Sequence, residues 1–308
     1  MSTAGPTLAA FILERARAEG FDDAAVVPAD TALQDVDEVR RAMDDGRHGP
    51  LAWLKESVDQ RVDIRARYPW ARSVLVVVQS YFQGDHNEHV PDLDGRAKVA
   101  RYAWGHDYHN MLRRRLRRVR RALLEAAGGG RCAPFLDVDA VLERAWAQAA
   151  GLGFIGKSTL FIHRGLGTWT FLGGAVTDID LGPRTRPLQT QLCGSCTACM
   201  DACPTQAIVR PQVVDAARCL VTWNVEETED PRGDAFGGSG WAVGCDVCQE
   251  VCPWNRFEKR TQEPRLVPIA GHVAFSPADA PTDVQGTPLA RPGVDVLPRL
   301  AARALKRP

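Results

Sequence analysis

Apolar side chains recur along the chain at the spacings of helices and strands. Residues 7–18 carry an apolar stripe at helical intervals, and Gly20 follows it, so we predict a helix that ends at this glycine. A short apolar run at 24–27 predicts a first strand. The segment 29–46 predicts a second helix with Asp30 or Thr31 as its N-cap and Gly46 past its end. Residues 73–82 form a largely β-branched apolar run, which predicts a strand buried on both faces.

A long amphipathic helix is predicted to begin at Tyr108. Its apolar side carries Met111, Leu112, Leu116, Val119, Leu123 and Leu124. Its basic side carries Arg113, Arg114, Arg117, Arg118, Arg120 and Arg121. The basic side has two interpretations: a solvated helix face, or a surface that contacts nucleic-acid phosphates and makes binding depend on salt.

Shorter elements follow a run of three glycines. Residues 132–137 predict a strand that ends near Asp137, and 142–151 predict a short helix stopped by its final glycine. Two further strands are predicted, one in 151–163 and one in 167–181, with a turn between them.

The pattern weakens toward the end of the chain. From Arg256 onward no strong periodicity is present, and 277–295 is proline-rich, which predicts a loop. Residues 296–308 predict one short final helix.

Residues 151–158 read GLGFIGKS and satisfy the phosphate-loop spacing G-x4-G-K-[ST]. A phosphate loop joins a strand to a helix, whereas this segment follows a predicted helix and leads into a predicted strand. A nucleotide site is therefore disfavoured. The glycines are interpreted instead as positions where the backbone approaches a bulky ligand closely.

Helices and strands are mixed before a cysteine-rich segment, so we predict an α+β fold in which an α/β part precedes a ferredoxin-like module. The chain has 308 residues, 45% of them apolar, which suggests about two domains with ordinary cores. A formal net charge of zero gives no overall sign of a polyanionic partner. Because the sequence has neither a basic leader nor a membrane-length apolar stretch, we expect a cytoplasmic protein without a membrane partner.

Eight of the nine cysteines fit a pattern typical of bacterial ferredoxins. The run CGSCTACMDACP has the spacing C-x2-C-x2-C-x3-C-P, in which three thiolates hold one iron–sulfur cluster and the fourth reaches the other. The second run, CDVCQEVCP, is one ligand short, and one more cysteine lies between the runs. We therefore predict two four-iron sites with crossed ligands, Cys193, Cys196, Cys199 and Cys252 for one and Cys203, Cys219, Cys245 and Cys248 for the other.

Two other interpretations of the cysteines are weaker. Four-cysteine zinc sites also use C-x2-C pairs, but rarely with this continuous spacing and a closing proline. Disulfides are disfavoured because no export signal precedes the runs, and reducing compartments keep thiols free. The ninth cysteine, Cys132, is predicted to be a small buried apolar side chain. Clusters transfer single electrons but do not by themselves specify a substrate.

Polar residues in apolar or glycine-rich surroundings precede the cysteines. They are the cluster RYAWGHDYH at 101–109, Asp137 at a predicted strand end, and Lys157 after glycines. Each also has a purely structural interpretation: the two histidines of the cluster could cap or pack, and Asp137 or Asp139 could cap the following helix. Local sequence leaves both interpretations open.

Several motifs together resemble the epoxyqueuosine reductase family, cobalamin-dependent enzymes that complete queuosine in transfer RNA. They are HGPLAWL, ARSVLVVVQSYF, RYAWGHDYHNMLRRRLRRV, FLDVDAVLERAWAQAAGLGFIGKSTLFI, CGSCTACMDACPTQAI, ARCL and GCDVCQEVCPWN, in the family's order over most of residues 45–258. A generic ferredoxin would share only the cysteines, so the motifs upstream of them decide this interpretation.

The resemblance implies a particular division of the chain. It implies a nitroreductase-like cobalamin-binding domain, related to reductive dehalogenases, in 1–182, and a ferredoxin-like double-cluster domain in 183–258. The C-terminal tail, 259–308, is shorter than the helical repeats of many relatives. The residues that it places around the cobalamin are Arg61, Arg101, Asp137, Lys157, Leu160, Cys245 and Asp246.

The resemblance also implies the reaction and a proton donor. Epoxyqueuosine at the wobble position would be reduced to queuosine, with electrons passing through two [4Fe-4S] clusters to cobalamin, and Asp137 would be the catalytic acid. An acid in this role needs a pKa raised by burial, which we expect of Asp137. The sequence departs from the family pattern at Val138, Asp139 and Ala140, so Asp139 could alter the pKa of Asp137 or replace it.

The expected partners follow from the same resemblance. We expect a monomer that takes single electrons from a flavodoxin or ferredoxin and binds the anticodon loop, whose unpaired bases can be splayed into a pocket. Two alternatives stay open: a corrinoid iron–sulfur reductase of a small organohalide or epoxide that does not act on RNA, and an electron-transfer protein fused to a non-catalytic domain.

Overall fold

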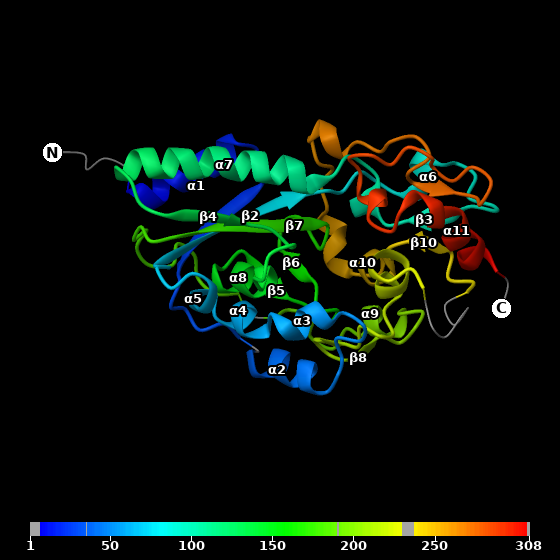
Figure 1. The fold of residues 1–308 in the computed structure, drawn as a ribbon, viewed down its shortest axis with the longest axis horizontal. Helices are drawn as coiled ribbons and strands as arrows, with labels where there is room; N and C mark the ends of the chain where they lie inside the picture. The colour runs from blue at the N-terminus through cyan, green and yellow to red at the C-terminus, as the bar shows by residue number, and fades with distance from the viewer. Residues whose placement is uncertain (1–6, 35, 190, 230–236, 307–308) are drawn as a thin grey trace.

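A computed structural model describes residues 7–34, 36–189, 191–229 and 237–306. Its centre is a four-stranded antiparallel sheet. In spatial order the strands are β1 (Asp23–Pro28), β2 (Ser73–Ser80), β7 (Thr170–Thr177) and β4 (Cys132–Phe135). Helices cover both faces of this sheet (Figure 1).

Strand β2 lies inside the sheet, as its apolar run predicts. It pairs along its whole length with β7, from Ser73 opposite Thr177 to Ser80 opposite Thr170, and all of its residues are buried. Strand β4 is an edge strand and contains Pro134, a residue that edge positions tolerate because proline cannot donate to a neighbouring strand. The loop after β4 therefore leaves the sheet at an open edge.

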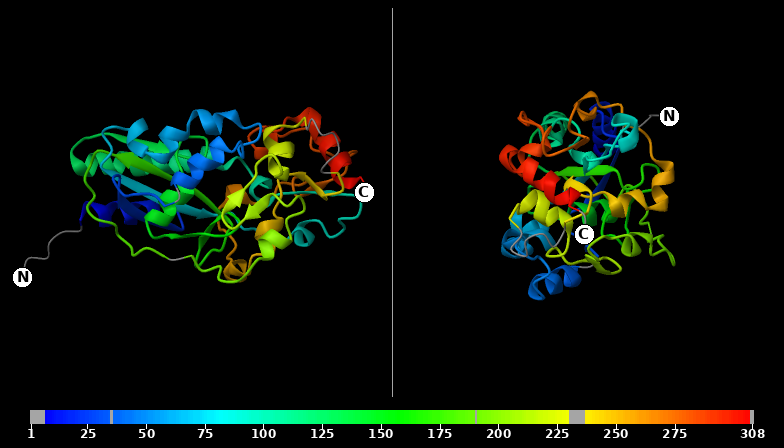
Figure 2. Two further views of the ribbon diagram at one scale, coloured as in Figure 1. Left: turned by 90° about the horizontal axis from the view of Figure 1, so that it is seen from below. Right: turned by 90° about the vertical axis from the view of Figure 1, so that its right-hand side faces the viewer.

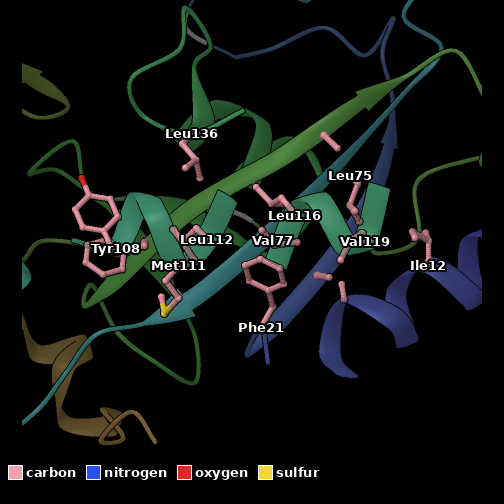
Figure 3. Close-up of a cluster of buried hydrophobic side chains, with 14 of the residues drawn as sticks. Ile12, Phe21, Leu75, Val77, Tyr108, Met111, Leu112, Leu116, Val119 and Leu136 are labelled. Carbon is pink, nitrogen blue, oxygen red and sulfur yellow. The ribbon is translucent and has the colours of Figure 1, made fainter. Parts of the chain in front are cut away.

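Two predicted helices cover one sheet face, α1 (Leu8–Ala18) and α7 (Tyr108–Ala127). Thr7 caps α1 by accepting a hydrogen bond from a backbone N–H, and Gly20 follows the helix at a φ of 90°, which confirms the predicted end. The apolar stripes of both helices pack with the sheet into one core (Figure 3). Cys132 is buried in this core, as predicted.

The second core lies on the opposite sheet face. The helices below the sheet in Figure 1 are α2 (Val36–Asp44), α3 (Ala52–Glu56), α4 (Val58–Val62), α5 (Ile64–Arg67) and α8 (Glu143–Ala149). Of these, α5 and α8 contribute buried apolar side chains to the core. The predicted N-cap of the second helix, Asp30 or Thr31, is wrong, because α2 begins at Val36 and the backbone N–H of Ala29 bonds the Arg72 carbonyl, which extends the pairing of β1. Residue 35, inside that predicted helix, lies outside the described part.

The glycine-rich segment after α8 is a hairpin, where one strand was predicted. Its strands, β5 (Gly153–Ile155) and β6 (Phe161–His163), are antiparallel, and Thr159 in the turn has a φ of 67°. A Cβ on Gly153 would lie 2.2 Å from the carbonyl oxygen of Ile162, so the close strand approach requires glycine there. This geometry joins a helix to a hairpin, which agrees with excluding a phosphate loop.

The cysteine-rich segment has short elements. They are α9 (Ala198–Asp201), β8 (Ile208–Arg210), β9 (Val213–Val214), a π-helical turn (Thr222–Glu226) and α10 (Val247–Glu250). It lies beside the central sheet, at the end of the elongated molecule that also holds the last helix (Figure 2).

A three-stranded sheet at this end joins distant parts of the chain. Its order is β10 (Trp241–Val243), β3 (Ala97–Val99) and β11 (Ala274–Phe275), and α11 (Leu297–Leu305) packs on it. Beside it lie the helix α6 (His86–His89) and short 3-10 turns at 101–103, 288–290 and 294–296. Two further 3-10 turns, at 253–257 and 264–266, lie next to the first cysteine set and the core of the central sheet. The final helix and the preceding loop were predicted, whereas β11 was not.

Each strand of the three-stranded sheet comes from a different one of the three predicted domains, whose boundaries stay predictions. Among the described residues, no helix is long and apolar enough to cross a membrane.

Gly174 allows β7 to pack tightly, and its replacement gives a first prediction. A Cβ there would lie 2.1 Å from the Leu75 carbonyl oxygen and 2.5 Å from the Phe135 ring. We expect Gly174→Ala to lower the free energy of unfolding by about 1–3 kcal/mol or more, because neither neighbour can move freely. Thermal unfolding measures this, with Gly165→Ala, at an exposed position with ordinary contacts, as the control. Equal melting temperatures for the two variants would contradict the prediction.

Candidate active site and cysteine centres

Asp137 lies in the loop that leaves the sheet edge after β4, beside the first turn of α7. Its carboxylate accepts a hydrogen bond from the Tyr108 hydroxyl, and its Oδ1 is 2.8 Å from His109 Nε2. The Tyr108 ring is fixed by stacking on Phe171, with ring centroids 3.9 Å apart. The side chain of Asp137 is still 48% exposed, so the carboxylate can meet a substrate from outside.

A second carboxylate fixes His109 on its other side. Asp107 caps α7 by accepting from the backbone N–H of His109, and the same oxygen lies 2.7 Å from His109 Nδ1. The imidazole is therefore held between Asp107 and Asp137, with one ring nitrogen toward each. This arrangement favours the doubly protonated imidazolium.

The pKa values in this cluster are shifted in the opposite direction to that of an isolated buried acid, whose pKa would be raised. Burial alone would raise the pKa of Asp137, but His109 and the Tyr108 hydroxyl together lower it below its usual value. Burial likewise opposes charge on His109, yet the two carboxylates raise its pKa to about 9. The expected raised pKa of Asp137 is therefore wrong for the free protein. At neutral pH the proton resides on His109, next to the Asp137 carboxylate.

Glu143, the first residue of α8, is an acid with a raised pKa near this cluster. Burial and the charge of Asp137 raise the pKa of Glu143 to about 8, and its Oε1 is buried without a hydrogen-bond partner among the described residues. The neighbouring Arg61 is also buried; its Nε donates to Ser57 Oγ at 2.8 Å and its guanidinium lies 5.0 Å from the Trp53 ring centre. A buried, unpartnered carboxyl oxygen marks a place where a ligand can supply the missing contact.

Asp139 has a structural role. Its Oδ2 accepts from the backbone N–H of Leu136 at 3.0 Å, and its Oδ1 lies 3.4 Å from Arg67 Nη2. One oxygen thus closes the turn, and the other pairs with Arg67 of α5. The suggested cap of the next helix is wrong for both aspartates, because Leu142 precedes α8 without a side-chain cap. Between the aspartates, Val138 is 56% exposed.

Arg101 is buried in a network behind the second cysteine run, its side chain only 3% exposed. Its guanidinium lies 3.2 Å from Asp246 Oδ2 and 2.9 Å from Glu250 Oε1. A third carboxylate, Asp85, is 2.9 Å away, and the Gly84 carbonyl accepts from Nε. Arg101 and Asp246 therefore hold this run against the rest of the protein. Direct contact of either residue with cobalamin stays a prediction.

The first predicted ligand set surrounds one pocket. The pocket is lined by Lys157, Ser158, Ile162, Leu192, Cys193, Cys196, Ala198, Cys199, Cys252, Pro253 and Trp254. Lys157 Nζ donates to the carbonyls of Gly194 at 2.6 Å and Cys196 at 2.9 Å, so it holds the cysteine loop. Leu160 lies partly exposed in the adjacent hairpin turn.

The second predicted ligand set is also brought together. Burial raises the pKa of Cys245, and the nearby thiols of Cys219 and Cys203 raise it further. Cys248 has a raised pKa from burial, from Cys245 and Cys219, and from Cys199 of the first set. The two sets are thus neighbours. The structure groups the cysteines as the crossed pattern requires, and their role as ligands stays a prediction.

The spacing of these thiols bears on the zinc alternative. Four sulfurs at 2.3 Å from one zinc ion would lie within about 4 Å of each other. Among the described residues, no three side chains of the types His, Cys, Asp or Glu are close enough to hold a single metal ion. What favours a cluster over zinc is the continuous spacing C-x2-C-x2-C-x3-C-P of the first run, which is the ferredoxin pattern.

Two polar residues of the site, His109 and Glu143, have surroundings that local sequence does not reveal. His109 was considered only as a capping or packing group, and Glu143 was quoted only within a motif. The signal for His109 is the Asp-x-His spacing at a helix start, but its second partner, Asp137, is 28 residues away. The orphaned oxygen of Glu143 depends on tertiary burial alone.

Comparison with known proteins shows which family this chain resembles. Residues 61–138 match the family described as epoxyqueuosine reductase QueG, DUF1730, and residues 192–255 match the 4Fe-4S double cluster binding domain. The chain is 36% identical to an epoxyqueuosine reductase of Cellulophaga algicola, over 84% of this chain and 83% of that one. It is 39% identical to one of Gloeobacter violaceus, over 82% and 77%.

A solved structure extends the similarity to the fold. It is an epoxyqueuosine reductase crystallised with a tRNA-Tyr epoxyqueuosine-modified stem loop, and it is 25% identical to this chain with a TM-score of 0.78. The match covers 96% of this chain and 80% of that one. Because the sequence identity to the curated relatives extends over most of both chains, and the double-cluster segment matches as well, the chain belongs to the epoxyqueuosine reductase family.

Proposed function

We propose that this chain reduces epoxyqueuosine to queuosine in transfer RNA, with electrons supplied through two [4Fe-4S] clusters. The observation that carries the proposal is a half-exposed carboxylate, Asp137, paired with the protonated His109 in a protein that also has a double-cluster segment. Members of the same family are epoxyqueuosine reductases, and the solved structure with a modified stem loop supports transfer RNA as the substrate.

The reaction determines how many electrons and protons the site must supply. Converting an epoxide to an alkene breaks two C–O bonds, forms a C=C bond and releases the oxygen as water, so it consumes two electrons and two protons. The electrons come one at a time from the clusters. We assign Cys193, Cys196, Cys199 and Cys252 to one cluster and Cys203, Cys219, Cys245 and Cys248 to the other, supported by the two groups of neighbouring thiols.

Cobalamin is the cofactor that the family resemblance implies, and the residues present fit it in one respect. Glu143 offers a buried carboxyl oxygen without a partner among the described residues, beside the buried Arg61. The residues that would hold the cofactor are Arg61, Arg101, Asp137, Lys157, Leu160 and the backbone of Cys245 and Asp246. When bound, cobalamin supplies a reduced cobalt centre that can deliver two electrons as a nucleophile.

The protein's own residues manage the proton at the epoxide oxygen. His109 stores a proton at neutral pH, and Asp137 lies between it and the open side of the site. As negative charge develops on the substrate oxygen, Asp137 passes on the proton that it receives from His109, and a second proton from solvent completes the water that leaves. Asp107 keeps the imidazole oriented during this transfer.

The His109 proton predicts the pH dependence of turnover. Because a group with a raised pKa is charged below that value, turnover should hold at neutral pH and fall as pH rises through about 9. In His109→Gln the cation that lowers the pKa of Asp137 is gone, so burial dominates and the basic limb should move to lower pH. The single-turnover rate against pH measures this, with the exposed neighbour His106→Gln as control. An unchanged limb in His109→Gln would count against the proton store.

The decisive test of the function is reconstitution. The clusters are rebuilt without oxygen, cobalamin and a reductant are added, and RNA carrying epoxyqueuosine is analysed for queuosine. Formation of queuosine supports the proposal. Reduction of a small organohalide or epoxide without any change in the RNA would favour a small-molecule reductase, and failure to bind cobalamin would favour an electron-transfer protein.

Finer features of the fold and partners stay proposals. We propose a nitroreductase-like cobalamin-binding domain in 1–182, a double-cluster domain in 183–258 and a C-terminal segment in 259–308. A monomer that accepts electrons from a flavodoxin or ferredoxin in the cytoplasm is consistent with the family chemistry. Size-exclusion chromatography and reduction by each purified donor test the oligomeric state and the electron source.

A further inference from the structure

The arginines of α7 are not equivalent. Four of the seven are engaged within the protein: Arg115 with Glu263 and Gln79, Arg118 with Glu19, Arg120 with the Cys132 carbonyl, and Arg121 with Glu125. The other three, Arg113, Arg114 and Arg117, are exposed, and none makes an ion pair or a side-chain hydrogen bond to a residue in the described ranges. Arg113 is close enough to Asp107 to lower the pKa of that carboxyl.

These three arginines extend from the active site along the helix. His109, Arg113 and Arg117 are spaced four residues apart, so they lie in line with a step of about 6 Å along the axis. Arg114 lies beside this line, about 100° around the helix from Arg113. The three arginines together are called the arginine row. The line begins at His109, whose Nε2 touches Asp137. On the adjacent line, Arg120 donates to a carbonyl of β4, so this side of α7 faces the sheet edge from which the Asp137 loop emerges.

A merely solvated helix face accounts poorly for this arrangement. Like charges three and four residues apart repel and destabilise a helix by a few tenths of a kcal/mol per pair. The other four arginines of α7 contact carboxylates, an amide oxygen or a carbonyl. Arg113, Arg114 and Arg117 point to solvent on the part of the helix that follows His109. A row of unpaired guanidinium groups, each a planar fork of donors, is complementary to a chain of phosphates.

We propose that Arg113, Arg114 and Arg117 bind the phosphates of the RNA strand that flanks the nucleotide entering the active site. The inference rests on the proposed function, because the base that reaches Asp137 fixes where its neighbouring phosphates lie. Positions about 6 and 12 Å along the helix from His109 are within the reach of the adjoining nucleotides. The arginine row thus anchors the backbone, and the pocket beside Asp137 reads the modified base.

The test compares two triple variants with the same loss of charge. Arg113→Gln/Arg114→Gln/Arg117→Gln removes the row, and Arg41→Gln/Arg65→Gln/Arg72→Gln removes three arginines that are at least half exposed elsewhere. Binding of an unmodified anticodon stem–loop is measured from low to physiological salt. We expect the row variant to bind at least tenfold more weakly, with the slope of log K against log salt reduced by about 2, since each phosphate contact contributes about 0.7–0.9. The control should match the natural protein.

Turnover distinguishes the inference from the proposed function. With RNA carrying epoxyqueuosine, the row variant should show a KM raised at least tenfold and an unchanged kcat, and circular dichroism and iron content should stay normal. Equal salt slopes in the two triple variants would overturn the inference, whatever the enzyme's activity. Absence of queuosine formation by the natural protein would overturn the proposed function instead, because the binding measurement uses unmodified RNA and does not depend on catalysis.

Discussion

Asp137→Asn is expected to abolish queuosine formation while both clusters and the fold are retained. The amide has nearly the same shape and can still accept from the Tyr108 hydroxyl, but it cannot carry a proton from His109 to the substrate oxygen. Loss of a positioned acid typically costs 10²–10⁴-fold in rate, so we expect a loss of about this size in the single-turnover rate. The measurement is queuosine formed per reduced enzyme, with iron content and cobalamin binding checked in parallel.

Asp139→Asn is the matched control for this experiment. It lies two residues away and its amide oxygen can keep the contact with the Leu136 N–H, although the ion pair with Arg67 is weakened. We expect a small effect on rate, because Asp139 closes a turn and donates no proton to the substrate. If Asp139→Asn lost as much activity as Asp137→Asn, the two carboxylates would share the role, and undiminished turnover in Asp137→Asn would remove Asp137 from the mechanism.

Local signals in the sequence are sufficient for the long elements of the fold. Thr7 and Gly20 mark both ends of α1, and the apolar stripe of α7 predicts the face that packs on the sheet. Contacts between distant segments explain the errors. Because Ala29 pairs with Arg72, α2 begins later than predicted. The single strand predicted in 151–163 includes Lys157, Ser158 and Thr159, which form the turn of the hairpin β5–β6. The two residues of β11 form a strand only because β3, far earlier in the chain, offers an edge.

In the site, too, the local sequence predicts a residue, whereas contacts with distant residues determine its pKa. Asp137 is predicted from a motif that resembles the family, and the structure adds what the motif does not contain, the sign of its pKa shift. That sign depends on His109, which Asp107 orients from within the same helix start. The general expectation that a catalytic acid has a raised pKa applies to an isolated buried carboxyl. Here the pair, and not either residue alone, stores the proton.

Cys219 gives the second large expected effect, because it completes one cluster from outside both cysteine runs. Cys219→Ala is expected to halve the iron content and to abolish turnover, since a three-thiolate site binds its cluster weakly and the electron path is broken. The structure places the thiol beside Cys203 and Cys245, and the Trp223 indole N–H donates to the carbonyl of Ala217, which fixes the approach to Cys219. Iron analysis and electron paramagnetic resonance of the reduced protein measure the loss.

Cys132→Ala is the control for Cys219→Ala, because it also removes a buried thiol but from the core between α7 and the sheet. Iron content and turnover should be unchanged in Cys132→Ala, with only a modest loss of stability from the smaller side chain.

The crossed ligand pattern also predicts the effect of Cys252→Ala. This variant should keep the cluster that Cys219 binds and lose the cluster bound by the first cysteine run, although Cys252 lies in the second run. Loss of the cluster held by Cys245 and Cys248 in that variant would show that the ligands are not crossed.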